Sequence, residues 1–187
     1  SNNSFRYFDY YFSKYQHIIR KNRNSIAVIT DQDSPEDFEA LGDDIFTYFG
    51  LGCRNVSKVY HPEKFDINLL INSFNKFSFI KDHHKYRNNY DYQKSVFLVN
   101  GISHLDNGFV LARESTSLIS PVSVIHTEPY RSVDSLDLIL REQQDSLQCV
   151  VAGGKAFKGA VPFGKSQMPE LWDYADGIDT MEFLFSL

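Results

Sequence analysis

Short apolar runs alternate with amphipathic segments along most of this chain, and the alternation limits its fold more than any other feature. Runs rich in β-branched and apolar residues predict strands at 25–30, 56–60, 108–112, 122–125 and 147–151. Apolar residues recur at helical spacing around them, at 5–15, 35–49, 66–79 and 133–140. Such alternation is typical of a parallel sheet with helices on both faces. We therefore predict a three-layer α/β/α domain with a mostly parallel sheet.

Cap signals mark the ends of the helix predicted at 35–49. Ser34 is a helix N-cap type, Pro35 suits the first helical position, and the acidic Asp37 lies three residues after the cap. Gly50 and Gly52 are predicted to end the helix. Farther along, residues 93–99 fit a strand or a helix. The tyrosines of 86–92 fit an aromatic-faced helix, a capped turn or a substrate or subunit surface.

Composition and charge exclude several classes of protein. The 187 residues are enough for one sizeable domain, and 42% are apolar and 23% charged, as in ordinary globular proteins. The net charge is −5, the pI is about 5.6 and the basic residues are scattered, so we expect no nucleic-acid partner. We find no apolar run of membrane-spanning length. Two cysteines give no disulfide framework, and the reducing cytoplasm is the simplest location.

The two cysteines lie in contrasting sequence environments. Cys149 lies in an apolar strand pattern and is predicted to be a core residue. Cys53 follows Gly50 and Gly52, which allow a tight turn, and precedes the basic residues Arg54 and Lys58. Cationic neighbours favour the thiolate, which is the nucleophilic form. A cysteine in a glycine-rich loop is more often structural than catalytic, so spacing alone leaves both roles open.

The segment 50–58 resembles the nucleophile loop of the aldehyde dehydrogenase superfamily. There, a helix ends in a Gly-x-x-Cys turn, and a strand follows that begins near a Ser-Arg pair; here Ser57 and Lys58 occupy the matching place. Other segments resemble the family in the same order: 24–28, 108–111, 120–122 and 162–165. Within the superfamily, the segments 84–92, 161–167 and 172–179 are most similar to acyl-CoA reductases related to the bioluminescence fatty acid reductase.

The resemblance implies a reaction and a set of site residues. Cys53 would be the nucleophile that takes the acyl group from a CoA thioester, and NAD(P)H would reduce the resulting enzyme thioester to an aldehyde. Gly52, Arg54 and Asn55 would neighbour the oxyanion, for which the Cys53 backbone N–H is one donor. Glu114 resembles the carboxylate that holds the nicotinamide ribose, although its spacing to Pro121 is off by a few residues. A homodimer is also implied.

The chain departs from the family in two respects. It contains no glycine-rich dinucleotide fingerprint, and in the family the dinucleotide-binding half precedes the region resembled here. We therefore expect residues 1–187 to be a single catalytic domain without its cofactor domain, and the start at Ser1 suggests a fragment. Where hydrolytic members carry a water-activating Glu, this chain has basic and amide residues at 20–23. That favours acyl reduction over oxidation to the acid.

Other functions and sites fit the sequence less well. An acyl-phosphate or semialdehyde reductase would share Cys53, and an assembly domain would keep the fold without the chemistry. His83 and His84 lack further ligands at zinc-like spacing, so we predict no metal site. Three lysines could contact CoA or cofactor phosphates or could be solvated loop residues: Lys155, Lys158 and Lys165. Three aspartates are predicted to cap the last helices: Asp173, Asp176 and Asp179.

Overall fold

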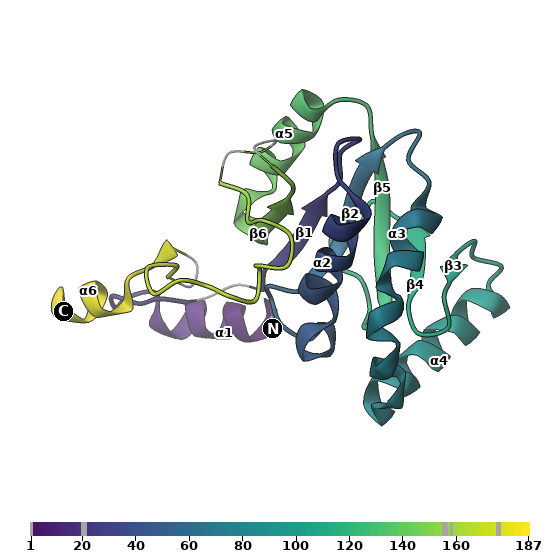
Figure 1. The fold of residues 1–187 in the computed structure, drawn as a ribbon. Helices are drawn as coiled ribbons and strands as arrows, with labels where there is room; N and C mark the ends of the chain where they lie inside the picture. Colours follow the sequence, from purple (N-terminus) through teal and green to yellow (C-terminus); the bar gives the residue numbers. More distant parts are fainter. Residues whose placement is uncertain (1, 20–21, 155–156, 158, 175–176) are drawn as a thin grey trace.

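The core of the protein is a six-stranded sheet with the order β3-β4-β5-β2-β1-β6 (Figure 1). The computed structural model describes residues 2–19, 22–154, 157, 159–174 and 177–187. All neighbouring strands pair in parallel except β3, which runs antiparallel to β4. The predicted mostly parallel sheet is therefore confirmed. The strands are β1 (Asn24–Val28), β2 (Val56–Pro62), β3 (Leu105–Asp106), β4 (Leu111–Glu114), β5 (Val124–Tyr130) and β6 (Leu147–Ala152).

Helices cover both faces of the sheet, as predicted (Figure 1). Helices α2 (Pro35–Phe46) and α3 (Ile67–Ser73) pack on the face that carries Ala27 and Val59. Helix α5 (Val133–Glu142) packs on the opposite face, against Ile26 and Tyr60. Because successive strand residues point to opposite faces, each central strand contributes to both cores. The domain thus has three layers.

Helix α4 (His84–Val99) resolves the two ambiguous segments, since both belong to it. Its Tyr90 and Phe97 are buried against the β4 and β5 strands. The 3₁₀ segment η2 (Phe74–Asp82) continues α3, so the helix predicted at 66–79 is split in two. His83 is the N-cap of α4, and its ring stacks on Phe49 with 3.9 Å between centroids. No group of three or more metal-ligand side chains occurs among the described residues.

The N-cap of α2 forms as predicted, but its C-terminal end differs. Ser34 and Asp37 make a reciprocal capping box. The α-helix ends at Phe46 and a 3₁₀ turn, η1 (Thr47–Gly50), follows. The prediction of one helix through Phe49 was therefore wrong. Helical periodicity continues through these residues in the sequence, but the backbone does not.

The terminal helices α1 (Asn2–Phe12) and α6 (Thr180–Phe185) lie outside the layers around the sheet (Figure 1). The aromatic residues of α1 are largely exposed. Asp179 caps α6 as predicted, whereas Asp173 accepts from the Glu170 N–H in a turn. Lys165 is exposed; Lys155, Lys158 and Asp176 lie outside the described residues. No described helix has the length and apolar character needed to cross a membrane.

Candidate active site

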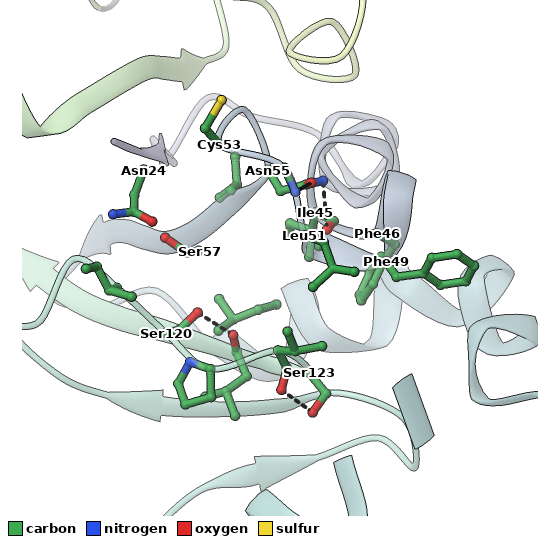
Figure 2. Close-up of a pocket in the computed structure, with 18 of the residues that line it drawn as sticks. Asn24, Ile45, Phe46, Phe49, Leu51, Cys53, Asn55, Ser57, Ser120 and Ser123 are labelled. Carbon is green, nitrogen blue, oxygen red and sulfur yellow. Dashed lines mark hydrogen bonds between the residues drawn. The ribbon is translucent and has the colours of Figure 1, made fainter. Parts of the chain in front are cut away.

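Cys53 lies at the amino edge of the sheet, in the turn that leads into β2 (Figure 2). A pocket of about 310 Å³ opens beside this turn. Most of its lining comes from three segments at the starts of parallel strands: 49–53 before β2, 119–123 before β5 and 22–24 at the start of β1. The sheet brings these segments together because parallel strands begin at one edge. The segments 24–28, 50–58 and 120–122, which carried the sequence resemblance, therefore meet at one site.

The backbone before Cys53 is strained. Tyr48, Phe49 and Gly50 adopt left-handed conformations in succession, with φ of 54°, 61° and 70°. Glycine takes this conformation readily, but a tyrosine or phenylalanine does so at a cost of roughly 1–2 kcal/mol. Strained backbone of this kind persists where the surroundings hold it, and it is concentrated at functional sites. The sequence showed the glycines but not the two aromatic residues in this conformation.

The side chain of Asn55 makes several of the hydrogen bonds that hold this strained turn. Its buried Nδ2 donates to the carbonyls of Asp44, Ile45 and Thr47 at 2.8 to 3.2 Å, which satisfies the end of α2. Its Oδ1 accepts from the Gly52 N–H at 2.8 Å. A Cβ on Gly52 would lie 3.0 Å from that same Oδ1, so the contact favours glycine. The side chain of Asn55 is therefore bonded to the backbone around the turn.

The Cys53 thiol is exposed, and its sulfur is directed away from Ser57, Ser120 and Ser123 (Figure 2). Its backbone N–H donates to no described residue. Its carbonyl accepts from the Ser25 hydroxyl at 2.9 Å. Among the described residues, neither the thiol nor the N–H has a hydrogen-bond partner, whereas the carbonyl is held by Ser25.

Cys149 contrasts with Cys53, as the sequence predicted. It is partly buried and packs against the main core. Its sulfur lies 2.9 Å from the Ser25 oxygen. Since Ser25 has one hydroxyl hydrogen, which goes to the Cys53 carbonyl, the Cys149 thiol is the donor of this second bond. Burial raises the pKa of the Cys149 thiol, which fits its protonated form.

The two basic residues near Cys53 have other partners. Lys58 is fully buried, and its ammonium contacts Glu128 and donates to the Thr116 carbonyl. Lys58 therefore holds the loop before β5, and the structure does not bring its charge to the thiol. Arg54 donates through Nε to the carbonyl of Ser166. That bond links the Cys53 turn to the loop at 162–166, which resembles a family motif in sequence.

Glu114 does not lie with Cys53. It is at the carboxyl end of β4 and lines a different pocket, with residues 102–105. Leu111 pairs with Val124, which lines the Cys53 pocket, and Glu114 is three residues farther along the strand, or roughly 10 Å. The described residues therefore do not place Glu114 beside the nucleophile, and its cofactor role stays a prediction.

Sequence reasoning missed several residues of the site. Asp44 interrupts the apolar face of α2, and a charge at that helical position was a usable signal. Tyr86 lines the pocket with its hydroxyl buried and without a hydrogen-bond partner among the described residues. Burial raises its pKa, so the phenol stays protonated. Ser25 carried no signal, because it lies within an ordinary strand pattern.

Comparison with known proteins supports the fold and no finer assignment. No protein-family model matches the chain, and no curated protein sequence matches it. Among solved structures, it is similar to the P. syringae indole-3-acetaldehyde dehydrogenase, a cysteine-to-alanine mutant in complex with NAD+ and IAA. The TM-score is 0.58 at 7% identity, over 86% of this chain and 40% of that one.

The delta-pyrroline-5-carboxylate dehydrogenase of Mycobacterium tuberculosis is also similar, with a TM-score of 0.51 at 14% identity. The match covers 81% of this chain and 35% of that one. The chain thus spans well under half the length of either dehydrogenase. The likeness confirms the predicted aldehyde dehydrogenase-type fold.

Proposed function

We propose that this chain is the nucleophile-bearing domain of an aldehyde dehydrogenase-type oxidoreductase, with Cys53 as the nucleophile. The observation that carries the proposal is the position of Cys53. Its exposed thiol follows a strained turn beside a pocket, in a fold shared with two dehydrogenases. A solvent-accessible thiol with a free backbone N–H is what a covalent mechanism needs.

We propose further that the full protein reduces a fatty acyl-CoA to an aldehyde with NAD(P)H. The motifs at 84–92, 161–167 and 172–179 support this branch of the superfamily. A second support is the pocket itself: none of the described residues that line it is a carboxylate. Asn22 and Arg23 lie there instead. Hydrolysis of an enzyme thioester needs a base to activate water, and these residues offer none.

The acylation step follows from the chain's own atoms. The Cys53 thiolate attacks the thioester carbonyl, forming a new S–C bond. The negative charge develops on the carbonyl oxygen, and we propose the Cys53 N–H as one donor to it. When the carbonyl reforms, the bond to CoA sulfur breaks and CoA leaves as its thiolate. The acyl group remains on Cys53 as a thioester.

The nicotinamide cofactor belongs to another part of the full protein in this proposal. The described residues do not form a dinucleotide site: no glycine-rich phosphate loop occurs, and Glu114 lies away from Cys53. NAD(P)H supplies hydride to the acyl group when it is bound. Residues 1–187 are therefore proposed to act with a cofactor domain, and we also propose that the full protein is a homodimer.

A substrate comparison in full-length protein tests the branch. Oxidation of NAD(P)H is followed with a long-chain acyl-CoA or an acyl phosphate, and reduction of NAD(P)+ is followed with a free aldehyde. The proposal predicts turnover with acyl-CoA and its loss in Cys53→Ser. Turnover with acyl phosphate alone would assign the domain to the acyl-phosphate branch instead. Turnover with acyl-CoA in Cys53→Ser would remove the nucleophile from the proposal.

A further inference from the structure

Asp44 is a fully buried carboxylate within the apolar face of α2. Burying a charged group is costly unless hydrogen bonds compensate it. Both of its oxygens accept such bonds: Oδ2 from the Gly164 N–H at 2.6 Å and Oδ1 from the Ser166 N–H at 2.8 Å. These partners are 120 and 122 residues away in the sequence. Asp44 therefore docks the loop at 162–166 onto the helix that precedes Cys53.

The docked loop fits closely against α2. Gly164 has φ of +76°, and a Cβ there would lie 3.3 Å from the Ala40 Cβ. Phe163, next to it, is buried in the core that α2 helps to form. The loop at 162–166 is thus closely packed against α2, and its position depends on the hydrogen bonds to Asp44.

Ser166 is tied on its other side to the Cys53 turn. Its N–H donates to Asp44 and its carbonyl accepts from Arg54, the residue after Cys53. On the other flank of Cys53, the Gly52 N–H is bonded to Asn55. Both neighbours of the nucleophile are therefore fixed through side chains.

These ties also meet at the end of α2. Asn55 donates to the backbone carbonyl of Asp44 at 3.0 Å, so the two networks share one residue. Between them lie the left-handed residues Tyr48 and Phe49. A strained turn keeps its shape only while its surroundings hold it. Loss of one tie should loosen the whole turn.

We propose that Asp44 is a positioning residue for Cys53, acting through Ser166 and Arg54. The importance of Asp44 for catalysis rests on the proposed role of Cys53. The hydrogen bonds of Asp44 are independent of that role. Asp44 is not among the residues that line the pocket. Its loss is therefore expected to lower the rate of Cys53 acylation and to leave substrate affinity nearly unchanged.

Hydrogen exchange tests the link without any chemistry at Cys53. In Asp44→Asn, the side-chain NH₂ group faces backbone N–H donors, so the Gly164 and Ser166 amides should exchange faster. The proposal requires that the Gly52 amide, on the other side of Cys53, also exchanges faster. The Ile29 amide, which bonds to the Tyr60 carbonyl at the opposite edge, reports on the rest of the sheet and should not change. Asp43→Asn, an exposed neighbour paired with Lys76, is the matched control.

Acylation rates supply the second test in full-length protein. Asp44→Asn and Arg54→Lys should each slow Cys53 acylation by about tenfold or more, because small misplacement of a reacting group has large effects. The double variant should be no slower than the slower single variant, since both remove the same tie. Asp43→Asn should stay within about twofold of the unsubstituted protein.

Either of two results overturns the inference. One is unchanged Gly52 exchange in Asp44→Asn while Ser166 exchange rises, because the tie then ends at the loop. The other is additive slowing in the double variant. If Asp44→Asn does not fold, Arg54→Lys carries the same exchange test at Gly52. If unsubstituted protein forms no acyl adduct, the proposed function fails, but the exchange result still decides whether the tie exists.

Discussion

The two edges of the parallel sheet are held together in different ways. At the carboxyl edge, a pocket of about 920 Å³ is bounded by Thr30, Asp33, Tyr130 and neighbouring residues. Its Asp33 accepts from the Thr30 N–H at 2.7 Å, a bond between residues three apart. At the amino edge, the bonds around Cys53 join segments that are up to 122 residues apart. Distant bonds occur at both edges, since the Tyr130 hydroxyl donates to the Ile29 carbonyl 101 residues away, but at the amino edge they converge on one turn.

This difference bears on where function lies. Open parallel sheets usually bind ligands outside the carboxyl ends of their strands. Here the exposed thiol, the left-handed turn and the buried Asn55 and Asp44 contacts gather at the amino edge. Strained backbone costs stability, and it is concentrated where it serves a functional site. The comparison therefore favours the pocket beside Cys53 as the proposed functional site.

Removal of Asn55 should have the largest effect. Asn55→Ala leaves four buried or part-buried backbone groups without their side-chain partner: the Gly52 N–H and the carbonyls of Asp44, Ile45 and Thr47. We expect a loss of about 3–4 kcal/mol in the free energy of unfolding, measured with urea. Asp33→Ala at the carboxyl edge is the matched variant and should cost about 1 kcal/mol. Equal losses at the two edges would contradict the comparison.

The buried Lys58 comes next. Lys58→Met removes the partner of Glu128 and releases the Thr116 carbonyl. Because the Glu128 side chain keeps 27% exposure, we expect a loss of about 2–3 kcal/mol, somewhat below that for a fully buried pair. Adding Glu128→Gln should restore part of it, since the unpaired charge is then gone. A double variant as unstable as Lys58→Met would argue against a charge effect.

The two cysteines should differ in reactivity. Iodoacetamide is expected to label Cys53 at least about tenfold faster than Cys149 near neutral pH, because only Cys53 is exposed and burial raises the pKa of Cys149. Labelling of Cys149 should keep accelerating above the usual thiol range, as its thiolate forms only there. Peptide mapping by mass spectrometry measures both rates. Comparable rates at the two sites would refute the contrast.

Relief of the strain should give the smallest effect. Tyr48 is 68% exposed with φ of 54°, a conformation that asparagine tolerates better. Tyr48→Asn should therefore raise the unfolding free energy by about 0.5–1 kcal/mol. Tyr92→Asn, at an exposed position in α4, is the control and should not stabilise. Stabilisation by both variants would mean that strain is not the cause.

The sequence predicted the features of the fold that depend on local patterns of residues. Alternating apolar runs gave the layers, and Ser34 and Asp37 gave the start of α2. The contrast between Cys53 and Cys149 followed from their immediate neighbours. The fold class and the nucleophile candidate were within reach because each depends on residues close together in the chain.

The remaining features depend on residues far apart. The end of α2 at Phe46 follows from Asn55, which bonds the final carbonyls, whereas periodicity alone predicted a longer helix. Lys58 pairs with Glu128 on a neighbouring strand. The sequence predicted instead that the Lys58 ammonium would lie near the Cys53 thiol. Glu114 was assigned by resemblance although its spacing to Pro121 is off by a few residues, and strand register places it at the other edge.

Covalent trapping tests the central claim most directly. Full-length protein is incubated with a labelled long-chain acyl-CoA, and the adduct is located by digestion and mass spectrometry. We predict one acyl group on the peptide that contains Cys53, retained in Cys149→Ala and absent from Cys53→Ala. An adduct that persists in Cys53→Ala, or that maps to Cys149, would contradict the account.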